Sequence, residues 1–192
     1  MRKFSCFMAV LAALAAPAAL AHSGAQSAAG IVAGFIHPFT GLDHLAAMVA
    51  VGLWAALAAP QRVWSLPVAF VLVMALGAAL GVAGVSPPDM EIGIAASVLL
   101  LGGLLAAMAR LPLSSAVALV GLFALLHGFA HGREMAADAD FAVYAAGFVA
   151  ATGMLHLFGI GLGRLLLRAP VLYRGAGGLI GAWGVYLLMA PG

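Results

Sequence analysis

Two imidazoles and a carboxylate lie within eight residues of an otherwise apolar sequence, in the stretch His37-Pro38-Phe39-Thr40-Gly41-Leu42-Asp43-His44. Imidazole nitrogens and carboxylate oxygens are ordinary ligands of divalent transition metals. The proline and the glycine are expected to interrupt the helix, so that His37 folds back over a helix whose first turn holds Asp43 and His44. Thr40 and Asp43 also match a helix-capping pattern. Asp43 therefore has two interpretations, a metal ligand or a residue that only caps its helix.

A second group of candidate ligands is His127, His131 and Glu134 in the stretch Leu126-His127-Gly128-Phe129-Ala130-His131-Gly132-Arg133-Glu134. Histidines four residues apart present both rings on one face of a helix, which is the spacing that zinc-binding helices use. Glu134 extends the same face by another turn. The alternative is a pair of unrelated histidines at the membrane interface.

His156 and His22 are candidates of a different kind. On an ideal helix His156 lies about 24 Å deeper than Asp140, so it should not belong to the first two groups. It is either satisfied locally, with Thr152 as the partner, or an inner station on a transport pathway. His22 would begin the chain after removal of a signal peptide, where its α-amine and ring together could bind a metal. The alternative is that it only follows the cleavage site.

Composition places these residues in a membrane protein. The 192-residue chain is 66% hydrophobic and 7% charged, with a mean hydropathy of +1.18. Such a chain has too little charged surface for a soluble globular domain, and its apolar runs are long enough to cross a bilayer. The lipid bilayer is thus a predicted partner, and the net charge of +2 gives no support for a nucleic-acid partner.

Residues 1–21 have the pattern of a secretory signal peptide, with two basic residues, an apolar core and a small-residue end at Ala19-Leu20-Ala21. The alternative is an uncleaved first transmembrane helix. With cleavage, residues 22–192 form a single transmembrane helical domain. That domain lacks the only cysteine, Cys6, which excludes disulfides and thiolate-bound metal from it.

The predicted fold is an all-α, polytopic membrane helix bundle. A short apolar segment at 28–39 is expected to form a broken or re-entrant piece. About six transmembrane helices should follow, near 41–59, 64–84, 92–109, 113–132, 141–163 and 175–190. Glycines spaced four apart predict close helix packing, in a compact bundle or a homo-oligomer, at Gly77/Gly81, Gly159/Gly163 and Gly177/Gly181.

Arginine placement predicts the direction of the spans, because short basic loops stay in the cytoplasm. If the mature N-terminus is outside, the only arginine in the outside loops is Arg133, and the inside loops hold five: Arg62, Arg110, Arg164, Arg168 and Arg174. This topology places both termini outside and brings the first two histidine groups to the same outer level.

Three stretches resemble a known family. His37 to His44, followed by Ala47-Met48-Val49-Ala50-Val51-Gly52-Leu53-Trp54, closely resembles the signature of HupE/UreJ proteins, small bacterial membrane proteins regarded as nickel or cobalt permeases. The stretch from His127 to Glu134 is similar to the second motif of that family, and Gly147 to His156 to its third. The resemblance implies metal uptake across the bacterial inner membrane, with both mature termini in the periplasm.

The sequence therefore predicts a nickel or cobalt uptake permease, not an enzyme, that captures the ion at an outward-facing site. The predicted ligands are His37, Asp43, His44, His127, His131 and Glu134. The ion is cargo, not a prosthetic group, and Zn²⁺ and Cu²⁺ suit the same donors. No nucleotide-binding motif is visible, which leaves the membrane potential or a coupled proton as the driving force. The alternatives are a membrane metalloenzyme and a metal-binding accessory protein that does not transport.

Overall fold

The computed structural model describes residues 22–135 and 140–190, with side chains from residue 30 onward, and every regular element in these ranges is helical. The predicted signal peptide lies outside the described residues. The helices are α2 (His22–Thr40), α3 (Leu42–Ala58), the short 3₁₀ helix η1 (Pro60–Arg62), α4 (Ser65–Val82), α5 (Met90–Ala107), α6 (Leu113–Glu134), α7 (Phe141–Leu166) and α8 (Pro170–Met189).

Five of these helices, α4 to α8, are long and apolar enough to cross a membrane by themselves. The segments 30–40 and 42–58 pass the same test as a pair, with a bend of 83° between them, which raises the number of candidate spans to six. The predicted polytopic helix bundle is therefore confirmed. The last span begins at Pro170, earlier than the predicted 175.

The junction between α2 and α3 differs from the prediction. α2 runs on through Pro38 to Thr40, so the break falls at Gly41 alone. The Thr40 hydroxyl donates a hydrogen bond to the His37 carbonyl (2.7 Å), inside its own helix. The predicted capping role of Thr40 is therefore wrong: Gly41 precedes α3, and no side chain caps that helix.

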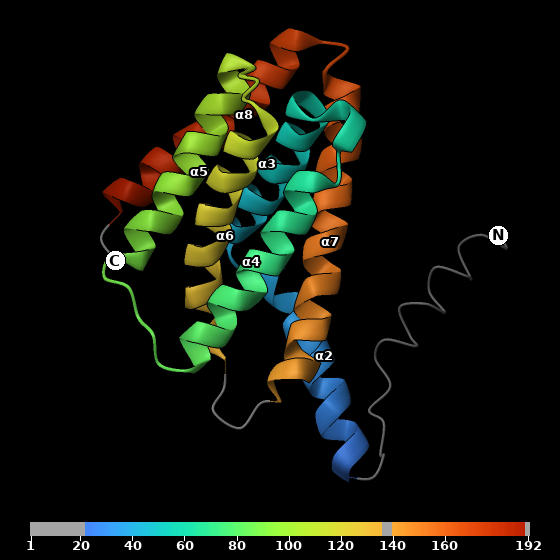
Figure 1. Ribbon diagram of the computed structural model, residues 1–192, viewed down its shortest axis with the longest axis vertical. Coiled ribbons are helices and arrows are strands. Elements are labelled where there is room, and N and C mark those ends of the chain that lie inside the picture. The colour runs from blue at the N-terminus through green and yellow to red at the C-terminus, as the bar shows by residue number, and fades with distance from the viewer. Residues whose placement is uncertain (1–21, 136–139, 191–192) are drawn as a thin grey trace, which may run out of the picture.

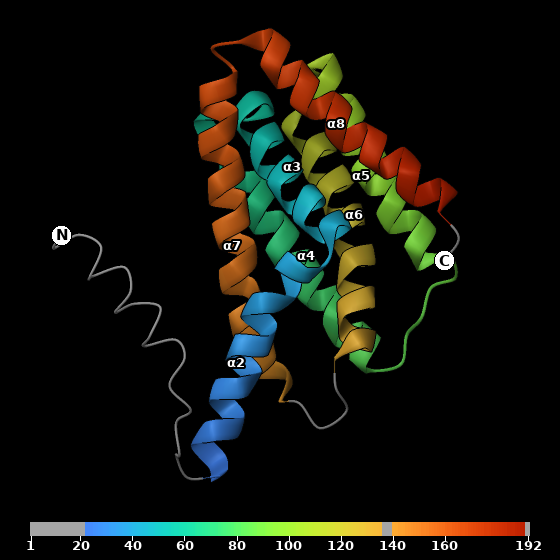
Figure 2. The same cartoon turned by 180° about the vertical axis from the view of Figure 1, so that it is seen from behind.

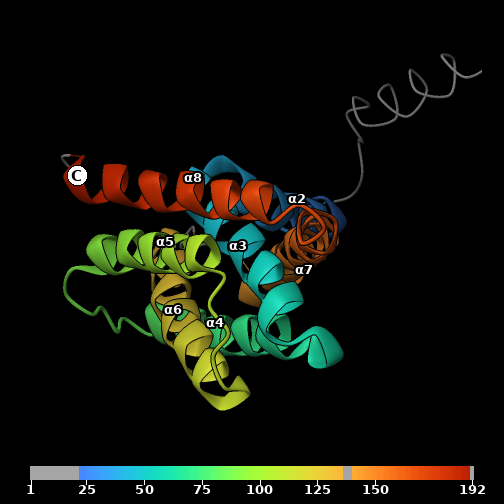
Figure 3. The same cartoon turned by 90° about the horizontal axis from the view of Figure 1, so that it is seen from above.

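α3 forms the centre of the bundle, with the other long helices around it (Figures 1 and 3). Most of its residues are buried, including the large side chains of Met48 and Trp54. The Trp54 ring nitrogen donates to the Ala109 carbonyl (2.9 Å), and the Tyr173 hydroxyl donates to the Leu53 carbonyl (2.9 Å). Hydrogen bonds thus tie the central helix to the segment after α5 and to α8.

Glycines bring three pairs of helices into backbone contact. A Cβ atom at Gly77 would meet the Leu125 carbonyl of α6, one at Gly159 the Val49 carbonyl of α3, and one at Gly177 the Ala106 nitrogen of α5. The predicted small-residue faces are therefore used inside the chain. Since these faces are covered by the chain's own helices, they give no support for the predicted homo-oligomer.

The two ends of the bundle differ in charge. The end of the bundle that contains the end of α6 and the start of α7 is here called the junction end, because α2 enters the bundle from it and meets α3 further inside (Figure 2). The opposite end carries the five arginines assigned to inside loops, at η1, between α5 and α6, and around the α7–α8 turn. Arg174 lies in the first turns of α8 instead of in a loop, and donates to the Ala106 carbonyl at the end of α5 (3.1 Å).

Candidate metal site

Three potential ligand atoms converge at the junction end, and the group of His37, His131 and Glu134 is called the junction cluster. His37 Nε2 lies 3.1 Å from Glu134 Oε2 and 3.0 Å from His131 Nδ1, and His131 Nδ1 lies 3.7 Å from the same carboxylate oxygen. The His131 side chain is 3% exposed and that of Glu134 is 46% exposed. The cluster therefore has one ligand in the protein interior and one at the surface.

These separations suit a transition-metal ion. Metal bonds to imidazole nitrogen and carboxylate oxygen are about 2.0–2.2 Å long. Two such ligands are therefore about 3.0 Å apart at a right angle and about 3.4 Å apart at a tetrahedral angle. The observed 3.0, 3.1 and 3.7 Å are close to this range. The three atoms could all bind one ion after small side-chain movements.

Asp43 and His44 form a pair next to this cluster, in the first turn of α3. His44 Nδ1 donates to Asp43 Oδ1 (2.9 Å), which leaves Nε2 as the free lone pair of a neutral ring. A carboxylate that binds the second ring nitrogen of a metal-binding histidine fixes its orientation. Asp43 also lies in the first turn of α3, where its charge favours the helix dipole, so the choice between a metal ligand and a residue that only caps its helix stays a prediction.

A hydrogen bond to a backbone group fixes the orientation of the His127 ring in the same way. Its Nδ1 donates to the Phe123 carbonyl one turn earlier in α6 (2.9 Å), and its side chain is fully buried. The Nε2 atoms of His127, His44 and His131 are all buried without a hydrogen-bond partner among the described residues. A buried polar atom without a partner is costly and needs an explanation. Coordination of an ion at these nitrogens would supply it.

The histidine rings follow one another from the junction cluster into the bundle. Ring centroids are 4.9 Å apart between His37 and His131, 4.3 Å between His131 and His44, and 5.1 Å between His44 and His127. The structure thus brings together the two histidine groups that are separated in the sequence. These four rings form the histidine series.

His156 lies apart from the histidine series, as its depth predicts. It makes no ring contact with another histidine in the described part of the chain, and its nearest aromatic neighbour is Phe70 of α4. Neither of its nitrogens has a hydrogen-bond partner there, and the Thr152 hydroxyl is also unpaired. The predicted Thr152 partnership is therefore wrong.

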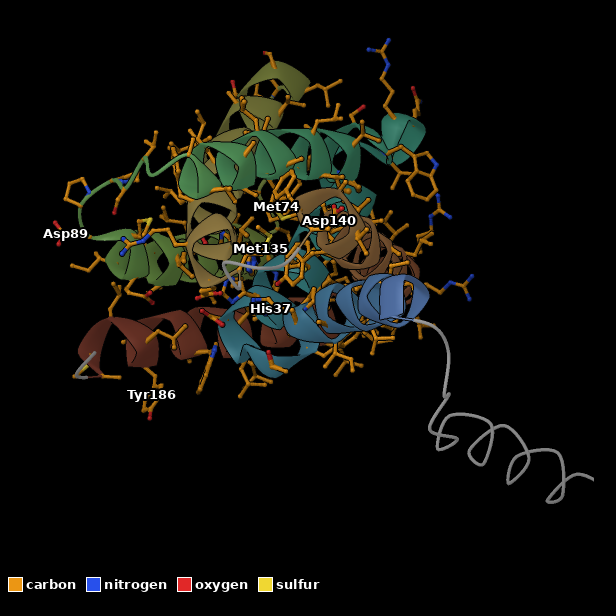
Figure 4. The ribbon with its side chains drawn as sticks, turned by 90° about the horizontal axis from the view of Figure 1, so that it is seen from below. His37, Met74, Asp89, Met135, Asp140 and Tyr186 are labelled. Atoms are coloured by element: carbon orange, nitrogen blue, oxygen red, sulfur yellow. The ribbon has the colours of Figure 1, made fainter. Side chains whose placement is uncertain are left out.

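Acidic residues that the sequence did not single out line the surface around the cluster. A hollow of about 500 Å³ borders Glu134 and also contains Asp89 and Glu91. A second hollow of about 680 Å³ contains Asp43 and again Glu91. In the view from the junction end, His37 lies near the middle of the outline, and Asp89 lies at its edge (Figure 4). Carboxylates therefore outnumber cations beside the cluster, since Arg133 is the one cation among the described residues that line the first hollow.

The remaining predicted residues lie outside this arrangement. Arg133 donates to the Ser86 hydroxyl, and Asp140 accepts from two backbone amides at the start of α7. His22 is the first residue of α2, and its side chain lies outside the described part of the molecule. The prediction that His22 binds metal stays a prediction.

Comparisons with known proteins agree with the motifs. The family model described as HupE / UreJ protein matches residues 9–187. A curated relative, Protein HupE of Rhizobium leguminosarum bv. viciae, is 45% identical over 190 residues, which cover 97% of this chain and 99% of the relative. No solved structure matches the chain. The match over nearly the whole length places this chain in the HupE/UreJ family.

Proposed function

We propose that this protein is an uptake permease for Ni²⁺ or Co²⁺. The family consists of membrane proteins that handle these metals, as transporters or accessory proteins and not as enzymes. Membership therefore excludes the metalloenzyme alternative. Transport by this chain, the identity of the ion and its ligands are the parts that we propose.

The observation that carries the proposal is a metal-compatible cluster that continues into the bundle. His37, His131 and Glu134 offer three ligand atoms that extend from the surface into the interior. Deeper in the bundle, the Nε2 atoms of His44 and His127 have no hydrogen-bond partner among the described residues. A protein that only stores or senses a metal needs one closed site. A series of buried, unpaired imidazoles that leads away from a surface site favours movement of the ion.

The direction of transport follows from charge. Five arginines lie at the end opposite the junction, and by the positive-inside rule they support a cytoplasmic location for that end. The junction cluster then faces the periplasm across the bacterial inner membrane, with both mature termini on the same side. Asp43, Glu91 and Glu134 would attract cations to this face.

Movement of a divalent cation into the cytoplasm is favoured by the membrane potential. At about 2.3 kcal/mol per charge per 100 mV, a divalent ion gains about 4.6 kcal/mol per 100 mV. A proton could be coupled to the ion, because metal binding and imidazole protonation compete. Nitrogen-rich sites bind Ni²⁺ more tightly than Co²⁺, so selectivity must come from geometry.

Purified protein in liposomes tests the proposal directly. With an inside-negative potential, we expect Ni²⁺ or Co²⁺ to accumulate inside, as measured with a trapped metal-sensitive dye. Variants His131→Ala and Glu134→Gln should lower both ion binding and uptake, and Asp140→Asn, which lies outside the cluster, should change neither. Binding of Ni²⁺ and Co²⁺ without any accumulation would refute the permease and favour the accessory protein.

A further inference from the structure

Phe70 separates the histidine series from His156. Its ring, on α4, is fully buried and lies with its centroid 5.9 Å from that of His127 and 5.2 Å from that of His156. The planes of Phe70 and His156 are nearly perpendicular, at 85°. The two imidazoles thus contact the same phenyl ring, and no direct contact between their own rings is found among the described residues.

A phenyl ring in this place is a barrier to an ion. It offers no lone pair to a metal, and it excludes the water that would otherwise hydrate the ion. Hydrophobic constrictions close ion pathways in this way in channels. Both imidazoles that contact the ring have buried nitrogens without a hydrogen-bond partner among the described residues. These are Nε2 of His127, and Nδ1 and Nε2 of His156. Each imidazole could therefore bind an ion, and the apolar ring contacts both.

The half of α4 that carries Phe70 lies beside an open hollow, although the ring itself is fully buried. The glycine contacts that hold α4 to α6 lie at Gly77 and Gly81, in the second half of the helix. In the first half, a hollow of about 200 Å³ lies between α4 and α7 and reaches His156. The hollow borders Pro67, Val68 and Val71 of this half, so a shift of the first half of α4 into it would move the Phe70 ring as well.

We propose that Phe70 is the gate between the outer imidazoles and His156, so that an ion passes inward only when this ring moves aside. The proposal rests on the proposed transport function and adds the element that controls passage. It assigns to Phe70 no part in ion binding, because the ring has no contact with the junction cluster in the described structure.

The test compares binding and flux in the full chain. Phe70→Ala should bind Ni²⁺ in detergent within about twofold of the unaltered protein. In liposomes with a fixed Ni²⁺ gradient, it should transport at least about fivefold faster and admit Mg²⁺, which we expect the unaltered protein to exclude. Phe70→Trp, with a larger ring, should bind equally and transport at least about fivefold more slowly.

Two further variants separate the gate from general packing. Phe129→Ala removes the same atoms from a buried position on α6 whose ring contacts no imidazole in the described residues, and it should leave flux unchanged. Phe70→Leu keeps apolar volume and folding while removing the ring, and it should give an intermediate leak.

Each outcome has a separate meaning. Unchanged flux in folded Phe70→Leu, or slower flux in Phe70→Ala with normal flux in Phe129→Ala, would overturn the gate. Slower flux in Phe70→Ala would instead indicate that the ring assists the passage of the cation. If the unaltered protein binds Ni²⁺ but never accumulates it, the permease proposal fails as well, and Phe70 has no pathway to close.

Discussion

Substitution of Gly41 by alanine perturbs the candidate site without removing a single ligand. The backbone of Gly41, with φ −103° and ψ 117°, is extended and accepts an alanine without strain. The added Cβ, however, would lie 2.7 Å from Asp43 Oδ1 and 2.8 Å from His44 Nδ1. Both distances are shorter than real carbon contacts. The pair must therefore move, and its hydrogen bond is disturbed.

The expected size of the effect comes from the role of Asp43. Loss of a residue that orients a metal-binding histidine typically lowers metal affinity about 10- to 100-fold. We expect Gly41→Ala to raise the Kd for Ni²⁺ by this factor, which corresponds to about 1.4–2.8 kcal/mol. Uptake at subsaturating Ni²⁺ should fall in proportion, and the helix content should not change.

Calorimetric titration of the detergent-solubilised protein measures the Kd. Gly103→Ala is a matched control, because a Cβ there would have no neighbour within 4 Å. A double-mutant cycle identifies the route of the effect. If alanine at position 41 acts through the Asp43–His44 pair, its cost should be smaller in an Asp43→Ala background than in the unaltered protein.

An unchanged Kd in Gly41→Ala would refute the reasoning, because all ligands would then bind without the observed pairing. Fully additive effects of Gly41→Ala and Asp43→Ala would refute it in a different way. They would show that the added methyl group acts elsewhere in the α2–α3 junction.

Further predictions concern the pathway, the pH dependence and the packing. His44→Ala and His127→Ala should each abolish ⁶³Ni²⁺ uptake at normal expression, and uptake retained in both would remove these residues from the site. His156→Ala should slow uptake far more than it weakens Ni²⁺ binding; equal losses would mean that it belongs to the outer site. Uptake at a fixed potential should fall on acidification, because protons compete with the metal for the imidazole nitrogens; uptake that stays constant at acidic pH would contradict imidazole ligation. Gly128→Ala, whose Cβ would meet the α4 backbone, should destabilise the bundle by about 1–3 kcal/mol in denaturant titrations, whereas Gly121→Ala, whose Cβ would make only an ordinary van der Waals contact with Val73 (3.7 Å), should not; equal stabilities would contradict the close contact.

The sequence predicts the spans well because one physical rule decides them. Long apolar runs with few charges must cross the bilayer as helices, whatever their neighbours are. The same rule does not decide where a run bends. Pro38 looked like the break, yet α2 continues through it and turns only at Gly41. The start of α8 was missed for a similar reason, because Arg174 reaches a carbonyl at the end of α5 and tolerates a helical position.

The candidate site could be predicted only as a set of residue types at one level. Topology placed His37 and His131 at the same end, but their contact depends on the 83° bend, which no spacing encodes. The sequence also did not predict that the Asp43 carboxylate binds the His44 ring, because this contact depends on how the chain turns into α3. The sequence does not distinguish Phe70 from the other apolar residues of its span. Its contacts with His127 and His156 depend on the rotation of α4 about its axis, which the sequence does not predict.

The separation of the donors along the chain makes metal occupancy a measure of assembly. His37 belongs to the bent pair of α2 and α3 and His131 to the separate span α6, so their meeting depends on tertiary association. An ion that binds only the associated form would stabilise it by about 2.7 kcal/mol at one hundred times its Kd. Under the proposed function, scarcity of the metal would leave the protein more loosely assembled and more exposed to proteolysis, so that the supply of cargo would help to set the amount of its carrier.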